Sequence, residues 1–210
     1  MNEFDLIFVL AGRPVRKIYG LELFRAGVAP RVLFSVARFE VRRFRELALP
    51  VEFDLLPIAL PVPAEERHFF VLFGGGAPEV ERIAVRRFGT LREIEALADY
   101  LGRHREIRSV LVVTSAVHLR RVRMCCEVIL ARGVHFQMAA VPPVGEGSRH
   151  GIQGEGYGEP VVGGSADAGL KRGATQTARE ARASFLEYGT EMVKLAGYRV
   201  LLGFRGRARF

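Results

Sequence analysis

A short apolar run that breaks abruptly into polar side chains is the feature that most constrains this fold. The run at 109–113 reads SVLVV, which is the short, β-branched pattern of a buried strand. Thr114 and Ser115 follow it directly, and a helical pattern carries on from His118. In open α/β sheets, strand carboxyl ends meet helix N-termini, and anionic ligands are favoured at that edge. The stretch therefore predicts an α/β sheet with a polar site at its carboxyl edge.

Strand and helix patterns alternate along the rest of the chain. Pro14 suits the first turn of a helix that Gly27 would close, and Gly133 would end the helix that follows Ser115. This alternation predicts a largely parallel sheet with helices on both faces. Strands are expected at Leu6–Leu10, Arg31–Ser35, His68–Phe73, Ser109–Val113 and His135–Val141, with room for one more at Val51–Leu55, and further helices at Phe39–Leu47 and from Thr90.

The chain of 210 residues is long enough for one well-buried core, which we expect to span 1–144. Glycines recur through the following stretch, where few large apolar side chains could anchor a fold, so 145–177 is predicted to be a mobile loop. Helical periodicity returns at 178–204, which is expected to close the same domain, and 205–210 forms a basic tail.

Composition narrows the function classes. No segment has the roughly 20 apolar residues of a membrane span, and Glu3 and Asp5 argue against a signal peptide, so a cytoplasmic location is predicted. Cys125 and Cys126 are adjacent in a helical pattern and are interpreted as core thiols. No cluster has the spacing of a metal site.

The formal net charge of +8 raises the question of nucleic-acid binding. The chain lacks the aromatic platform or zinc-finger spacing that such binding usually needs, so solvated basic faces are the favoured interpretation and nucleic acid the minor alternative. The two densest arginine clusters are Arg38, Arg42, Arg43 and Arg45, and Arg199, Arg205, Arg207 and Arg209.

The motif at 113–115 (VTS) with His118 and Arg121, preceded by a helix opening at Thr90 and Glu93, resembles the YdcF, SanA and ElyC family, a bacterial group built on a domain of unknown function. The resemblance covers about 4–141 and a late helix containing 186–188 (LEY). It departs from the family pattern at Val36, where glycine is usual, and at Gly89, where asparagine is common.

This resemblance implies a Rossmann-like three-layer α/β sandwich with a pocket at the strand ends. Members of the family are linked to envelope biogenesis, including peptidoglycan and surface-polysaccharide metabolism, and one is reported to bind S-adenosylmethionine. Glu93, His118 and Glu187 also belong to the pocket that the resemblance implies, and in an enzyme His118 with Glu93 or Glu187 would move a proton. The ligand-binding positions carried over are Gly12, Arg13, Ser35, Thr90, Thr114, Ser115 and Arg121.

Structural roles compete with these assignments. Thr90 and Glu93 have the spacing of a capping box, and Thr114 with Ser115 could cap the next helix. His118 could instead bond a loop carbonyl.

Two hypotheses therefore stand. An enzyme would act on an anionic or sugar-nucleotide-like envelope precursor, with Arg13 and Arg121 holding the anion. A non-catalytic binding or regulatory module would use the same pocket for a small anionic or S-adenosylmethionine-like ligand.

Overall fold

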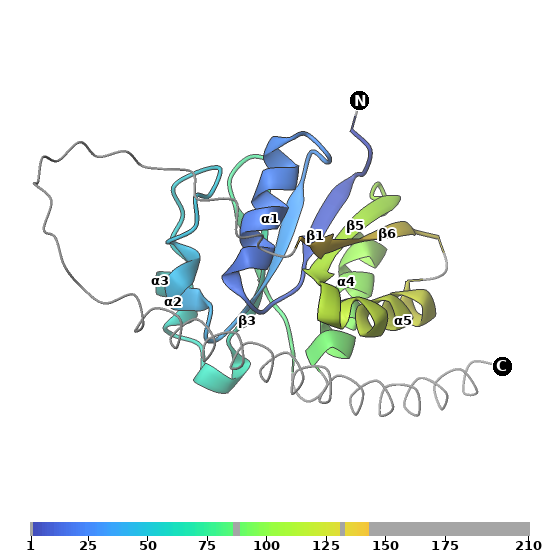
Figure 1. Cartoon of the computed structure of the whole chain (residues 1–210). Coiled ribbons are helices and arrows are strands. Elements are labelled where there is room, and N and C mark those ends of the chain that lie inside the picture. The colour runs from blue at the N-terminus through green and yellow to red at the C-terminus, as the bar shows by residue number, and fades with distance from the viewer. Residues whose placement is uncertain (1, 86–88, 131–132, 143–210) are drawn as a thin grey trace, which may run out of the picture.

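The computed structural model describes residues 2–85, 89–130 and 133–142 (Figure 1). The predicted loop at 145–177, the closing helix at 178–204, the tail at 205–210 and Glu187 lie outside the described residues.

A six-stranded sheet forms the centre of the described structure, in the order β4-β3-β2-β1-β5-β6. Parallel pairing joins β2 to β1, β1 to β5 and β5 to β6, whereas β3 is antiparallel to both of its neighbours. The sheet is thus mixed and mostly parallel. Its strands are β1 (Leu6–Val9), β2 (Val32–Ala37), β3 (His68–Phe73), β4 (Glu79–Arg82), β5 (Ser109–Ser115) and β6 (His135–Val141).

Helices cover both faces of the sheet, as the alternating pattern predicts (Figure 1). α1, α2 and α3 contribute to the apolar core on one face, and α4 with α5 to the core on the other. The helices are α1 (Pro14–Arg25), α2 (Val41–Phe44), α3 (Leu56–Ala59), α4 (Gly89–Arg103) and α5 (Leu119–Ile129), with single 3₁₀ turns η1 (Ala64–Glu66) and η2 (Ala116–His118).

The central strands are apolar throughout because both of their faces are buried. In β1, Ile7 and Val9 face α1, whereas Leu6 and Phe8 face α4 and α5. The same alternation directs Ser35 of β2 toward α4, since Phe34 before it belongs to the opposite core. A polar side chain therefore interrupts the apolar face of β2 close to its carboxyl end.

Two expectations about secondary structure are wrong, and one strand was not predicted. The helix predicted at Phe39–Leu47 is only the four-residue α2, and no strand forms at Val51–Leu55 in the described structure. β4 was not foreseen, because its sequence EVER lies on an exposed edge and carries no apolar run. The turn at 74–76 joins it to β3 as a hairpin, and β3 also runs antiparallel to β2, so the sheet is less uniform than expected.

Among the helices of the described part of the chain, none combines the length and the apolar character that a membrane crossing requires.

Close packing of α1 on β1 depends on Gly20, which gives a testable prediction. A Cβ at this position would lie 2.4 Å from Cγ2 of Val9, so Gly20→Ala should overpack the core and lower the free energy of unfolding by about 1–3 kcal/mol. Gly102→Ala in α4 is the matched control, because nothing lies within 4 Å of the added methyl. It should leave stability unchanged or raise it by up to about 1 kcal/mol. Urea unfolding of both variants measures the difference, and equal effects would contradict the packing argument.

Candidate functional site

The candidate site lies where the carboxyl ends of β1 and β2 meet the first residue of β3. Because β3 is antiparallel, its first residue, His68, pairs with Ala37 at the end of β2. A cavity of about 460 Å³ opens at this edge, within the usual size range of small-molecule sites. Its walls are Ala11, Gly12, Ala37, Phe39, His68, Val85, Gly89, Thr90, Glu93 and Arg121.

Glu93, in the second turn of α4, is the centre of the hydrogen-bond network at this edge. Its Oε1 accepts from the backbone N–H of Ala11 at 2.9 Å and from the hydroxyl of Ser35 at 2.5 Å. Nε2 of His68 lies 3.6 Å from the same oxygen. The side chain is only 7% exposed, so these groups replace water around a buried carboxylate.

The hydrogen bonds also fix where the protons are. Ser35 Oγ lies 2.7 Å from Nε2 of His68 while donating its single proton to Glu93. Nε2 of His68 must therefore carry a hydrogen and donate it to Ser35. In a serine-hydrolase triad, by contrast, the imidazole accepts the serine proton and the carboxylate binds its other nitrogen. Ser35 thus bridges Glu93 and His68 and is not arranged as a nucleophile.

Glu93 is held in its ionised form. Burial raises the pKa of this carboxyl, but the nearby His68, the Ser35 hydroxyl and the Ala11 N–H outweigh burial and bring the pKa below its ordinary value. A carboxylate with a lowered pKa at the wall of a cavity can accept a proton or orient a donor group of a ligand.

Arg16 adds a buried positive charge beside the cavity. This side chain of α1 is 5% exposed, and it donates from Nε to Ser115 Oγ at 2.8 Å and from a terminal nitrogen to the carbonyl of Ala11 at 2.5 Å. Gly12 leaves space for it, because a Cβ there would lie 2.7 Å from that terminal nitrogen. Gly12 also has φ of +135°, a conformation that glycine adopts without strain.

Arg121 of α5 places a second guanidinium at the wall of the first cavity. It is 7% exposed and lines the cavity. Burial lowers the pKa of Arg16, Glu93 and Glu40 raise it, and Arg121 and Arg13 lower it further. Arginine nevertheless stays charged in proteins, so like charges from α1 and α5 face one another near Gly12.

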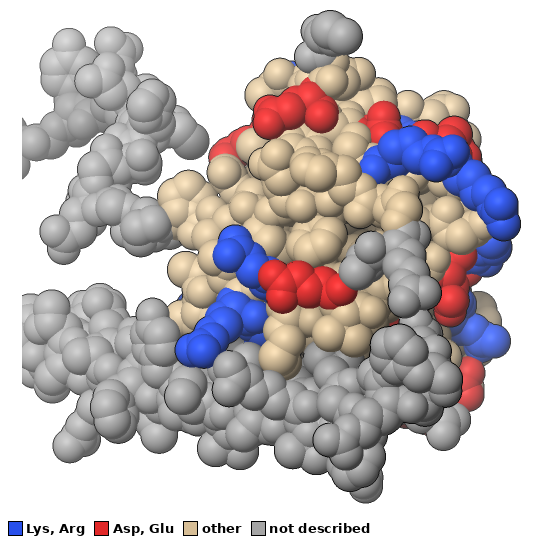
Figure 2. Space-filling view, turned by 90° about the vertical axis from the view of Figure 1, so that its right-hand side faces the viewer, with Lys and Arg blue, Asp and Glu red and all other residues tan. Residues whose placement is uncertain are grey.

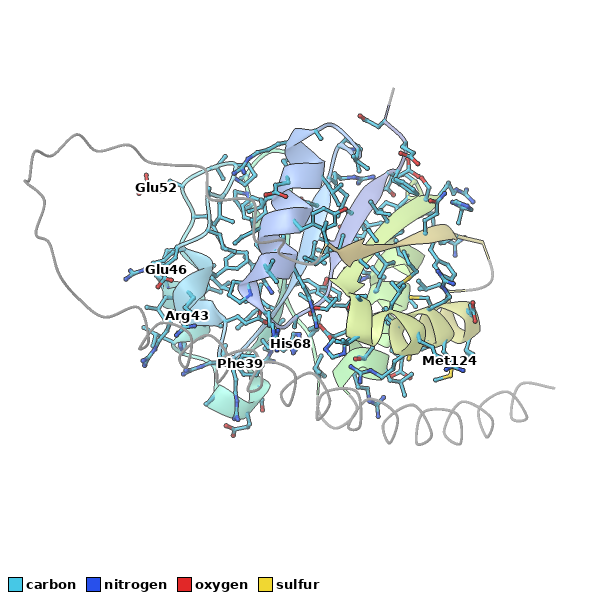
Figure 3. All side chains as sticks on the ribbon, viewed as in Figure 1. Phe39, Arg43, Glu46, Glu52, His68 and Met124 are labelled. Atoms are coloured by element: carbon cyan, nitrogen blue, oxygen red, sulfur yellow. The ribbon has the colours of Figure 1, made fainter. Side chains whose placement is uncertain are left out.

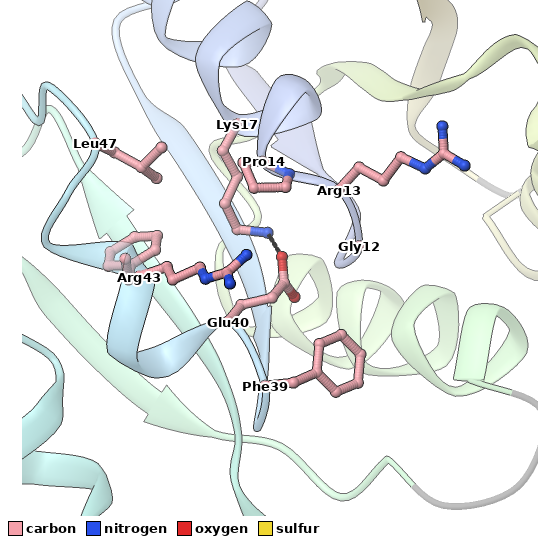
Figure 4. A pocket seen from close by; sticks show the side chains of 9 residues that line it. Gly12, Arg13, Pro14, Lys17, Phe39, Glu40, Arg43 and Leu47 are labelled. Atoms are coloured by element: carbon pink, nitrogen blue, oxygen red, sulfur yellow. Dashed lines mark hydrogen bonds and ion pairs between the residues drawn. The ribbon is translucent and has the colours of Figure 1, made fainter. Parts of the chain in front are cut away.

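A second cavity of about 350 Å³ adjoins the first and shares Gly12 and Phe39 with it (Figure 4). Inside it, the Lys17 ammonium is paired with Glu40, whose other oxygen accepts from the N–H of Ala37 at 2.9 Å. Burial lowers the pKa of Lys17, although Glu40 opposes this effect. The remaining wall residues are Arg13, Pro14, Arg43, Phe44 and Leu47.

Most of the residues singled out from the sequence either line one of the two cavities or hold a residue close to their walls. Gly12, Thr90, Glu93 and Arg121 line the first cavity, and Gly12 with Arg13 lines the second. Ser35 and Ser115 lie behind these walls and hold Glu93 and Arg16.

Thr114 and His118 lie elsewhere. Thr114 is fully buried, and its hydroxyl has no hydrogen-bond partner among the described residues. His118 ends η2 and is not part of the described walls of either cavity.

The capping interpretations do not account for Glu93 and Ser115. The carboxylate of Glu93 reaches across to Ala11 and Ser35 in the sheet layer. Ser115 immediately precedes η2, but its side chain makes no capping hydrogen bond and instead accepts from Arg16. Both side chains thus serve the carboxyl edge of the sheet.

Sequence reasoning missed Arg16, Lys17, Glu40 and His68. A signal for the first two existed, because Arg13, Arg16 and Lys17 lie three and four residues apart and so share one face of α1, directly after a strand end. His68 had no such signal, since only the antiparallel direction of β3 brings its first residue to this edge.

Comparison with known proteins adds no relative: no model of a protein family, no curated protein and no solved structure matches the chain. Within the described ranges, no group of three or more His, Cys, Asp or Glu side chains is placed to hold a metal ion.

The lowered pKa of Glu93 predicts a specific pH dependence. The stabilisation that it provides is fully present above the ordinary glutamate value of 4.5 and is lost as pH falls through the lower folded-state pKa. Glu93→Gln should reduce the free energy of unfolding at pH 7 by on the order of 1–3 kcal/mol, and this deficit should shrink below pH 4.5. Urea unfolding between pH 3 and 7 measures it. Glu52→Gln, at an exposed position, should follow the wild-type curve, and a deficit in Glu93→Gln that does not vary with pH would contradict the assignment.

Proposed function

We propose that this protein binds a small anionic ligand, of the phosphorylated-sugar or nucleotide-derived class, at the carboxyl edge of its sheet. The observation that carries the proposal is the pair of buried guanidiniums, Arg16 from α1 and Arg121 from α5, beside Gly12 and the first cavity.

Electrostatics supports this choice of ligand. A buried guanidinium is costly unless its charge is compensated, and the hydrogen bonds that described residues offer Arg16 come from uncharged oxygens of Ser115 and Ala11. Glu93 and Glu40 attract this guanidinium from nearby but Arg121 and Arg13 repel it, so a bound phosphate or carboxylate would add negative charge where positive charges gather. Arginine suits that role because its planar fork binds such anions through two parallel hydrogen bonds.

The parallel strands β2, β1, β5 and β6, with helices on both faces, are compatible with a Rossmann-like fold. β2 and β5 lie on opposite sides of β1, and in such folds ligands bind where the strand order reverses. Together with the resemblance to the YdcF family, this arrangement favours a bacterial envelope precursor as ligand. An S-adenosylmethionine-like ligand bound without turnover is the alternative from the same resemblance.

Catalysis is a second candidate, favoured by the ionised Glu93 and by His68 on the cavity wall. Glu93 would accept a proton from a water molecule that attacks the phosphorus of a phosphate ester, the P–O bond to the alcohol would break, and Glu93 would return the proton to the leaving alkoxide. Turnover of a phosphate-ester panel that disappears in Glu93→Gln would establish this role. Binding of the same esters with no turnover in the wild type would leave a binding module.

Nucleic-acid binding gains no support from the charge distribution. On the face shown in Figure 2, basic and acidic side chains lie next to one another rather than in a continuous basic patch. Several surface arginines are paired with carboxylates, including Arg103 with Glu81 and Arg82 with Glu66.

The proposal predicts a selective loss of anion affinity. Arg121→Gln should weaken binding of inorganic phosphate and glucose 1-phosphate about 10-fold or more, because a hydrogen bond to a charged group contributes about 1.5–3 kcal/mol. Arg16→Lys keeps the positive charge but loses the planar guanidinium that can donate two parallel hydrogen bonds. The affinity of this variant for phosphate should therefore lie between those of the wild type and Arg121→Gln. Isothermal titration calorimetry at low ionic strength gives the dissociation constants.

Arg92→Gln is the matched control, because Arg92 is a half-exposed arginine of α4 paired with Glu95. Its affinity should equal that of the wild type. A folded Arg121→Gln protein, judged by circular dichroism, that binds phosphate as tightly as Arg92→Gln would overturn the proposed site.

A further inference from the structure

We propose that the ligand has two parts, an anionic group held at the corner of Arg16 and Arg121 and a flat apolar group that packs on Phe39 in the second cavity. This inference rests on the proposed function and names the kind of molecule that the site would select.

The two cavities are arranged for one extended ligand. They share Gly12 and Phe39, so a molecule whose anion lies in the first can continue past the phenyl ring into the second. Phe39 and His68 lie at the same end of the molecule (Figure 3).

Phe39 differs from the phenylalanines of the apolar core. It is 70% exposed, whereas Phe34, Phe44 and Phe73 form a buried aromatic cluster. Folding therefore gains little from this ring. A large exposed aromatic at the mouth of a cavity is suited to stacking on a planar partner, since each ring face offers an apolar surface.

The backbone under Phe39 is held firmly. Glu40, the next residue, donates its N–H to the carbonyl of Ala37 at 2.8 Å, and its side chain accepts from the N–H of Ala37. The pairing of Glu40 with Lys17 ties this turn to α1. A ring on a fixed turn loses little conformational entropy on binding, which favours affinity.

The wall of the second cavity offers apolar surface to a ligand beside one internal ion pair. Lys17 and Glu40 neutralise each other within the wall, and Pro14, Phe44 and Leu47 supply apolar surface. Arg43 and Phe39 lie on opposite sides of Glu40 (Figure 4). A guanidinium also stacks on flat groups, so the cavity offers two surfaces for a planar partner.

Matched phosphate esters test the inference with the whole protein. Calorimetry would compare methyl phosphate with phenyl phosphate, which share the anion and differ in the flat group. The wild type should bind phenyl phosphate at least fivefold more tightly. Phe39→Ala should abolish this preference, so that the two esters bind with equal affinity, whereas Phe39→Tyr should retain it.

Leu60→Ala is the control, because Leu60 is also an exposed large apolar residue at 57% and lies outside the walls of both cavities. It should keep the full preference. If the wild type binds both esters equally, or Phe39→Ala keeps the preference, the two-part ligand is wrong while the anion site stands. If neither ester nor inorganic phosphate binds the wild type, the proposed function itself fails.

Discussion

The described structure depends most on one buried carboxylate, that of Glu93. It joins α4 to the end of β1 through Ala11, to β2 through Ser35 and to the start of β3 through the neighbouring His68. Because an ionised carboxylate out of water needs donors around it, these elements have little freedom to separate at this edge. Both backbone polar groups of Ala11 are hydrogen-bonded, since its N–H donates to Glu93 and its carbonyl accepts from Arg16. Ala11 thus links the negative charge of Glu93 to the positive charge of Arg16.

The strands that sequence reasoning predicts best are those buried on both faces. β1 and β5 are apolar through most of their length, and burial of both faces leaves only apolar residues favourable there. β4 has charged residues because it lies at an exposed edge, so it leaves no apolar signal. The direction of β3 is set by the connection at 38–67, which returns the chain to the same edge of the sheet, and not by the strand's own residues. This is why His68–Phe73 was predicted as a strand but not as an antiparallel one.

The candidate site could likewise be predicted only in part, because some of its features depend on tertiary structure. Gly12, Glu93 and Arg121 could be predicted at one edge, because each follows a strand end or lies near the start of a helix. Burial of Arg16 could not be read from its type, since arginine is normally exposed, and only the tertiary structure provides its two oxygen acceptors. His118 illustrates the opposite case: it stands out in the sequence motif but is not among the described residues that line either cavity.

The antiparallel pairing of β2 with β3 also affects how this domain could diversify. The connection between them, residues 38–67, leaves the carboxyl edge after Ala37 and returns to it at His68. It supplies Phe39, Glu40 and Arg43 to the second cavity. Substitutions at exposed positions of this connection, such as Phe39 and Arg43, leave the pairing of the six strands untouched, and exposed loop positions tolerate changes well. Ligand preference could therefore evolve in this one segment while Arg16 of α1 and Arg121 of α5, the proposed anion-binding residues, stay the same.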